Sequence, residues 1–107
     1  VKKQNGREGR VMLIRTTDGG KSWRNVSWVG PEPEGFAIMS SSLRLSGKRI
    51  LTTIRRKEKD ENWIEAWLSE DDGGSWRFLN RPAPSTGASS GNPPSLLRLK
   101  DGRLCLI

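Results

Sequence analysis

The sequence predicts an all-β protein made of antiparallel strands. β-Rich runs alternate with short turns that contain Asp and Gly, and no segment has convincing helical periodicity. One turn motif also occurs twice, as TTDGGKSW at 16–23 and as SEDDGGSW at 69–76, with every matched position 53 residues apart. A repeat of this length is expected to correspond to one structural unit of several strands.

The first hairpin is predicted around the first copy of the motif. The run GRVMLIRT at 9–16 leads into the turn, and SWRNVSWV at 22–29 leads out of it. A strand, an Asp/Gly turn and a second strand are the pattern of a β-hairpin. The segment GPEPEG at 30–35 predicts a loop, because Pro and Gly interrupt strands.

A second pair of strands is predicted in 36–56. The two strands flank a turn at Ser46–Gly47, and the charged segment KEKDEN at 57–62 is expected to be a loop.

The next strand, WIEAWLS at 63–69, alternates along its length. Trp63, Glu65 and Trp67 are expected on one face, with the intervening Ile, Ala and Leu on the other. The second turn motif follows, and WRFLN at 76–80 is expected to be its outgoing strand.

The remaining sequence predicts a loop and a final hairpin. The segment 81–94 is rich in Pro, Gly and Ser, and 95–107 reads as a hairpin around Asp101–Gly102. Leu-Arg-Leu at 97–99 matches Leu-Arg-Leu at 43–45 at a shift of 54. We therefore divide the chain into the outer half of one unit at 9–29, a complete unit at 36–80 and the inner hairpin of the next at 94–107.

Four short antiparallel strands per repeat are typical of one blade of a β-propeller. Within the repeated turn, the acid can accept hydrogen bonds from turn amides, and Gly supplies positive φ without steric cost. The first hydroxyl can hold the end of the strand, and the Trp ring can cover the hairpin. We therefore interpret the turn as a structural element rather than a reactive one.

The pattern S/T-x-D-x-G-x-x-W resembles the Asp box, or BNR repeat, of the sialidase (neuraminidase) superfamily. The residues that carry the resemblance are Thr16, Asp18, Gly20, Trp23, Ser69, Asp71, Gly73 and Trp76. The resemblance extends over almost the whole chain and implies about two blades of a six-bladed propeller. It also implies that the Asp boxes lie on the periphery, away from the active site.

The resemblance implies an exo-sialidase type of glycoside hydrolase that cleaves a terminal acidic sugar from glycans. Such enzymes hold the sugar carboxylate with three arginines and use a Tyr nucleophile paired with Glu, and an Asp acid/base. This chain contains no Tyr and no F-R-I-P-type sequence. We therefore expect no activity from this piece alone. The alternative is a non-catalytic glycan-binding or protein-interaction propeller.

The candidate substrate-binding residues are Arg55, Arg56, Glu34 and Asn92. An arginine grips a carboxylate bidentately and stays charged, which favours the two arginines, although a solvated basic strand end fits them as well. Glu34, with its neighbour Glu32, and Asn92 fall in loops between units, where exposed polar residues are common. We interpret Arg15, next to the first box, as structural.

Charge and composition limit the partners. The chain has 107 residues and a formal net charge of +7, which favours anionic partners such as acidic glycans. Nucleic acid is a weaker hypothesis, because the basic residues are scattered rather than gathered into one stripe. Cys105 is the single cysteine, and no apolar run is long enough for a membrane span. We expect no cofactor and no metal.

Two interpretations of the incomplete units remain open. In the one that we favour, the chain is a piece of a longer protein whose other blades complete the ring. In the other, three copies complete each other's units, since 107 is close to twice 53. We expect no signal peptide within these residues, and a secreted or periplasmic location is implied by the resemblance alone.

Overall fold

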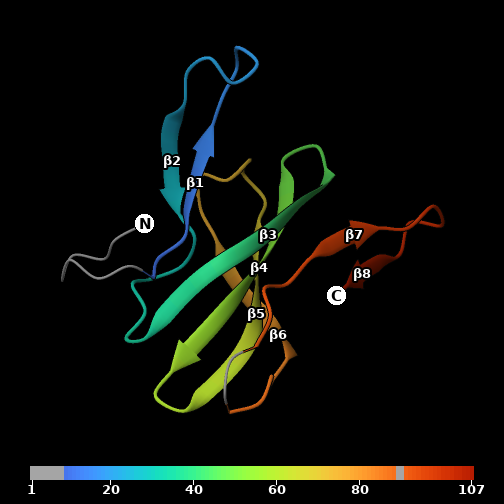
Figure 1. Ribbon diagram of the computed structural model, residues 1–107. Coiled ribbons are helices and arrows are strands. Elements are labelled where there is room, and N and C mark those ends of the chain that lie inside the picture. The colour runs from blue at the N-terminus through green and yellow to red at the C-terminus, as the bar shows by residue number, and fades with distance from the viewer. Residues whose placement is uncertain (1–8, 89–90) are drawn as a thin grey trace.

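The computed structural model describes residues 9–88 and 91–107, and in these residues it is all-β, as predicted. Three antiparallel sheets are present: β1–β2, the four-stranded sheet β3–β4–β5–β6, and β7–β8 (Figure 1). The described part of the chain contains no helix long and apolar enough to cross a membrane. The strands are β1 (Met12–Arg15), β2 (Arg24–Trp28), β3 (Phe36–Ser46), β4 (Arg49–Glu58), β5 (Glu61–Ser69), β6 (Arg77–Ala83), β7 (Leu96–Arg98) and β8 (Leu104–Leu106).

The central sheet corrects two expected boundaries. The predicted charged loop at 57–62 is mostly strand, because Lys57 pairs with Asn62 and only a two-residue turn at 59–60 remains. Lys59 makes this tight turn at a φ of 52°. β6 continues three residues beyond the predicted end at Asn80, through Pro82, which is tolerated because β6 is an edge strand.

β5 is buried along almost its whole length, which means that both faces of the central sheet are covered at this strand. The main apolar cluster lies on the face that the β1–β2 hairpin and the following loop cover. It contains Val29, Ala37, Ile54 and Trp67, with Val11 and Trp76 packed against it.

The β1–β2 hairpin is joined to the second Asp box by specific contacts. The Ser27 hydroxyl donates a hydrogen bond to the Gly73 carbonyl (2.5 Å) and accepts one from the Trp76 indole (2.9 Å). Arg15 forms an ion pair with Asp72 (3.0 Å), in agreement with the structural role expected for it. This hairpin and the central sheet therefore pack as one body.

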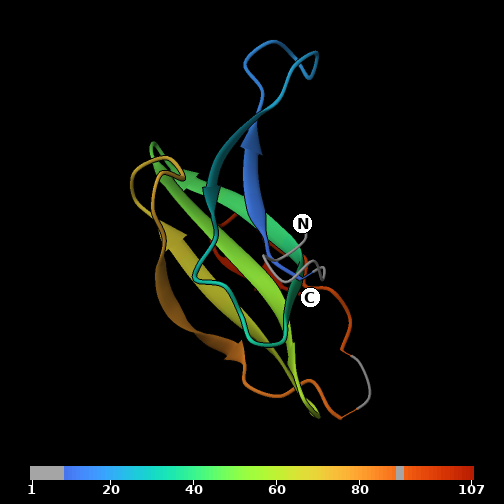
Figure 2. The same cartoon turned by 90° about the vertical axis from the view of Figure 1, so that its left-hand side faces the viewer.

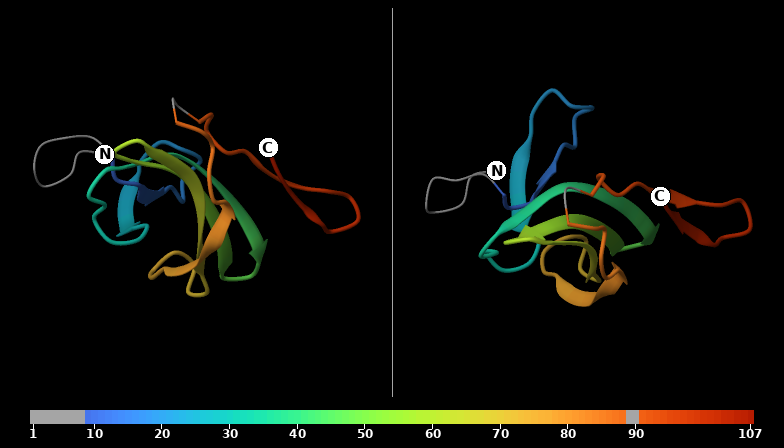
Figure 3. Two further views of the ribbon diagram at one scale, coloured as in Figure 1. Left: turned by 90° about the horizontal axis from the view of Figure 1, so that it is seen from below. Right: turned by 60° about the horizontal axis from the view of Figure 1, so that its bottom comes forward.

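The β7–β8 hairpin lies against β3, on another side of the central sheet (Figures 1 and 3). The guanidinium of Arg98 donates to the carbonyls of Arg44 and Leu45, and the Leu96 amide donates to the Ser41 hydroxyl (3.0 Å). A groove of about 430 Å³ remains between this hairpin and the sheet. Its lining residues are Ile64, Pro82, Ala83, Thr86, Asn92, Pro93, Pro94, Leu106 and Ile107.

The two ends of the central sheet differ in what they carry. The β3–β4 turn and the second Asp box lie together at one end, where the Asp72 amide donates to the Lys48 carbonyl (2.8 Å). The β4–β5 turn and the loops 30–35 and 84–88 lie at the other end (Figures 1 and 2). There the Thr86 amide donates to the Asn62 carbonyl (2.9 Å). We call the first the box end and the second the loop end.

Candidate functional site

The hydroxyl and the acid make the same hydrogen bonds in the two Asp boxes. In the first, Asp18 accepts from the Ser22 amide (2.9 Å), the Ser22 hydroxyl (2.5 Å) and the Thr16 hydroxyl (2.8 Å). Thr16 in turn accepts from the Gly20 amide (2.9 Å), and the indole of Trp23 donates to the Gly20 carbonyl (3.1 Å). The hydroxyl and the acid therefore act as we expect from the sequence.

In the second box, Asp71 accepts from the Ser75 amide (2.8 Å), the Ser75 hydroxyl (2.6 Å) and the Ser69 hydroxyl (2.8 Å). Ser69 accepts from the Gly73 amide (2.8 Å). The Trp differs between the boxes, because Trp76 donates to Ser27 in the neighbouring hairpin rather than to its own turn. The second box thus also connects two sheets.

These hydrogen bonds lower the pKa of both box carboxylates. The Ser22 hydroxyl and amide and the Thr16 hydroxyl lower the pKa of Asp18 from 3.8 to about 2. Ser75 and Ser69 lower the pKa of Asp71 from 3.8 to about 2 in the same way. Each carboxylate is ionised and fully engaged near neutral pH, which fits a structural role.

We predict a loss of stability in acid from these two groups. A carboxyl whose pKa is lower in the folded chain stabilises the fold at pH values above its unfolded pKa of 3.8. That stabilisation is lost as the pH falls from about 4 through about 2. Carbon-13 NMR titration of the two carboxyls should give midpoints near 2, and midpoints near 4 would contradict the hydrogen-bonded turns.

We predict that Asp71→Ala lowers the melting temperature more than Asp18→Ala does. Both substitutions remove the same turn hydrogen bonds, but only the second box holds the β1–β2 hairpin through Trp76 and Ser27. Trp23 of the first box is 59% exposed and bonds only to its own turn. Thermal unfolding of the two variants checks this, and equal melting temperatures would refute the connecting role.

A buried ion pair lies within the central sheet, toward the loop end. The Glu65 carboxylate, almost fully buried, accepts from Arg56 (2.6 Å) and from the indoles of Trp67 (2.9 Å) and Trp63 (3.2 Å). The pairing is diagonal, because Arg56 lies opposite Trp63 and Glu65 lies opposite Ile54. With three donors, Glu65 is positioned to hold Arg56 and the two indoles in place.

Arg81 presents an exposed guanidinium at the loop end. It stacks over the ring of Trp63 at 4.3 Å, and Arg56 lies over the same ring at 5.3 Å. Such stacking holds a planar cation without using its hydrogen-bond donors. The carboxylate of Glu65 therefore supports Arg56 and Trp63, and Trp63 supports Arg81.

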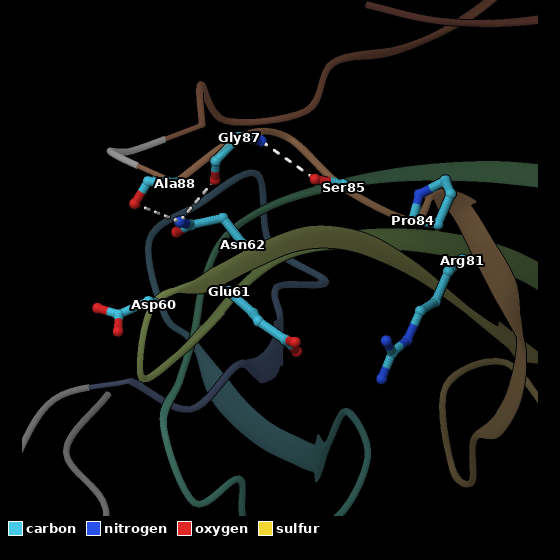
Figure 4. A pocket seen from close by; sticks show the side chains of 8 residues that line it. All are labelled: Asp60, Glu61, Asn62, Arg81, Pro84, Ser85, Gly87 and Ala88. Atoms are coloured by element: carbon cyan, nitrogen blue, oxygen red, sulfur yellow. Dashed lines mark hydrogen bonds between the residues drawn. The ribbon is translucent and has the colours of Figure 1, made fainter.

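Two adjoining hollows of about 340 and 490 Å³ meet at Arg81. Glu61 and Arg81 reach into the first from opposite sides, whereas Asn62 turns toward the carbonyls of Gly87 and Ala88 (Figure 4). The residues shared by both hollows are Asp60, Glu61 and Arg81. This surface offers one fixed guanidinium for an anion and two carboxylates that can accept hydrogen bonds from hydroxyls.

The structure places the two candidate arginines on opposite faces of β4. Arg56 is largely buried in its ion pair with Glu65. Arg55 pairs across the sheet with Ile64, on the face of the groove, and its guanidinium contacts the sulfur of Met39 (3.5 Å). Their role in binding substrate stays a prediction.

Glu34 and Asn92 occupy different loops. Glu34 and Glu32 are exposed in the loop between β2 and β3, at the loop end. That loop lies against the β4–β5 turn, because a Cβ atom at Gly35 would come within 2.0 Å of the Lys57 carbonyl. Asn92 is exposed and lines the groove beside the β7–β8 hairpin. Their contact with a sugar also stays a prediction.

Sequence reasoning missed Glu65 and Arg81 as members of a site. A signal for Glu65 was present, because an acid between two tryptophans on one strand face must find donors when that face is buried. No such signal pointed to Arg81, because the Pro/Gly/Ser-rich segment at 81–94 predicts a loop rather than the end of β6. No family model, curated protein or solved structure matches the chain.

Proposed function

We propose that the chain supplies about two blades of a sialidase-like β-propeller that recognises a terminal acidic sugar on glycans. One observation carries the proposal: two S/T-x-D-x-G-x-x-W turns, 53 residues apart, fold into the same hydrogen-bond network. The four-stranded sheet flanked by two hairpins supports it, since it has the strand order of one blade between parts of two others.

In this proposal the sugar binds at the loop end rather than at the Asp boxes. Arg81 supplies a rigid, exposed guanidinium for the sugar carboxylate, and Asp60 and Glu61 accept hydrogen bonds from sugar hydroxyls. The box carboxylates are already bonded to three donors each. Their negative charge disfavours an anionic sugar at the boxes.

Two functions share this site. In the first, the chain is part of an exo-sialidase-type hydrolase, in which another part of the protein supplies the Tyr nucleophile. In the second, the propeller binds glycans without cleaving them. Glu65 does not decide between them, because its carboxylate is enclosed by Arg56 and two indoles.

We predict that Arg81→Ala weakens binding of the methyl α-glycoside of N-acetylneuraminic acid by roughly ten- to a hundredfold. Loss of a charge-assisted hydrogen bond costs about 1.5–3 kcal/mol, and about 1.4 kcal/mol is a factor of ten. Isothermal titration calorimetry of the 107-residue chain measures the affinity. Arg77→Ala is the matched control, because Arg77 is exposed on the same strand near the box end.

The neutral methyl galactoside serves as the second control and should bind no better to the wild type than to Arg81→Ala. Equal loss of affinity in Arg77→Ala and Arg81→Ala would indicate general electrostatic attraction by the basic chain instead of a site. No binding of the acidic glycoside to the folded wild type would refute the proposed recognition by this chain.

A further inference from the structure

The repeat relates each hairpin to one half of the central sheet. A shift of 53 places β1–β2 on β5–β6, and a shift of 54 places β7–β8 on β3–β4. In the central sheet, β4 and β5 are paired with each other. Among the described residues, the corresponding edges of β8 and β1 have no strand partner. The two hairpins therefore carry complementary edges.

The site into which Trp67 packs provides a second comparison. Trp67 packs into the apolar cluster with Val29 and Val11. Its ring also lies so close to Gly30 that a Cβ atom there would be 2.8 Å from a ring carbon. Trp67 thus fills a packing site formed by the preceding hairpin and the loop after it.

The groove beside the β7–β8 hairpin is the equivalent packing site in the next repeat. A shift of 53 converts Val11, Val29 and Gly30 into Ile64, Pro82 and Ala83. All three of these residues line the groove, together with Leu106 and Ile107 of the last hairpin. This groove can therefore accommodate an apolar side chain equivalent to Trp67.

That side chain is Ile14, which corresponds to Trp67 at the same shift. Ile14 lies on β1 and is 47% exposed. The sizes are matched, because the large Trp67 faces Gly30 whereas the smaller Ile14 would face Ala83. The smaller side chain of Ile14 is thus compensated by the larger residue at Ala83, which keeps the packed volume similar.

Following the second of the two interpretations of the incomplete units, we propose that a second copy of this chain adds its β1 to the free edge of β8. The two hairpins then form a four-stranded antiparallel sheet, and Ile14 of the second copy enters the groove. The register follows from the central sheet, where Leu51 pairs with Leu68 and Thr52 pairs with Trp67. It pairs Leu104 with Thr16, Cys105 with Arg15, and Leu106 with Ile14.

This contact is head-to-tail, because each copy offers β8 to one neighbour and β1 to another. Such contacts repeat until they close into a ring or extend as a filament. A ring of three copies would contain six four-stranded sheets, of which three lie within single chains and three form between neighbouring chains. The pairing rests on the repeat and the strand register and is independent of the sugar chemistry proposed above.

Ile14→Asp tests the contact directly. Wild-type chain should have a mass in light scattering that is a multiple of 12.0 kDa, with three copies expected. Ile14→Asp should run as a folded 12.0-kDa monomer by light scattering and circular dichroism. Leu79→Asp is the matched control, because Leu79 is similarly exposed on β6 and should leave the mass unchanged. A monomeric wild type, or an oligomer that survives Ile14→Asp, would overturn the proposal.

A cysteine placed opposite Cys105 tests the register. Paired residues on antiparallel strands have Cα atoms about 4.5–5.5 Å apart, within the range that a disulfide spans. Arg15→Cys should therefore give covalent oligomers linked through residues 15 and 105, identified by peptide mapping without reductant. Arg24→Cys lies on β2, opposite Arg15 and one strand further from β8, and should give none. Equal linkage in the two variants would overturn the register.

Discussion

Replacement of Glu65 by Ala lowers the free energy of unfolding by about 3–5 kcal/mol, the usual cost of breaking a buried ion pair. The substitution leaves the largely buried guanidinium of Arg56 without its carboxylate. It also leaves the indole hydrogens of Trp63 and Trp67 without their acceptor. Urea unfolding followed by circular dichroism measures the change.

Glu70→Ala is the matched control for this prediction. Glu70 is exposed, and its two ion pairs, with Arg49 and Arg77, are long at 3.8 Å. Surface pairs of this kind contribute little, so we expect a change below about 0.5 kcal/mol. If Glu65→Ala were as mild as Glu70→Ala, the enclosed carboxylate would not be a determinant of the fold.

A double variant separates the ion pair from simple loss of packing. Arg56→Met with Glu65→Leu removes both charges and keeps apolar volume, so no buried charge is left unpaired. We expect this variant to be more stable than Glu65→Ala. Additive destabilisation by the two sites would indicate that Arg56 and Glu65 do not act together.

The second large effect is expected at Gly73, whose substitution by Ala destabilises the chain more than the same change at Gly20. The two glycines are repeat equivalents with φ values of 87° and 92°, so both variants lose about 1–2 kcal/mol from backbone strain. Only Gly73 has a tight neighbour: a Cβ atom there would be 2.1 Å from Leu13 Cδ2. Because Cδ2 is the far end of a flexible side chain, Leu13 can turn away, and we expect the lost packing against the β1–β2 hairpin to add about 1 kcal/mol.

At Gly20, by contrast, an added Cβ atom would approach only the Trp23 ring, at 3.8 Å. The difference between Gly73→Ala and Gly20→Ala, measured by urea unfolding, therefore isolates the packing of the hairpin on the second box. A truncating second change, Leu13→Ala, should relieve part of the Gly73→Ala defect. Equal losses at the two glycines would show that the hairpin does not pack on this turn.

The local structure of the turns was predictable because it depends on residues close together in sequence. The hydroxyl, acid, Gly and Trp of each box lie within eight residues, and the hydroxyl and acid side chains bond to their own turn. The all-β class and the strand order followed from the spacing of these turns. The segment 57–62 was mispredicted, because charged side chains do not prevent the backbone of Lys57 and Asn62 from pairing.

The site was less predictable because its members meet across strands. Whether Arg56 faces solvent or a carboxylate depends on the β4–β5 register, which no local pattern fixes. Arg81 reaches Trp63 because β6 continues past Asn80 and lies beside β5. The sequence supplied both charged residues but not their partners.

The most direct test of the proposed function is a nitrogen-15 NMR titration of the wild-type chain with the methyl α-glycoside of N-acetylneuraminic acid. We expect shifts at the loop end, in the Trp63 indole, Arg81 and residues 85–88, with the box amides of Ser22 and Ser75 unmoved. Shifts confined to the Asp boxes would contradict it, as would a titration that leaves the loop-end signals unchanged.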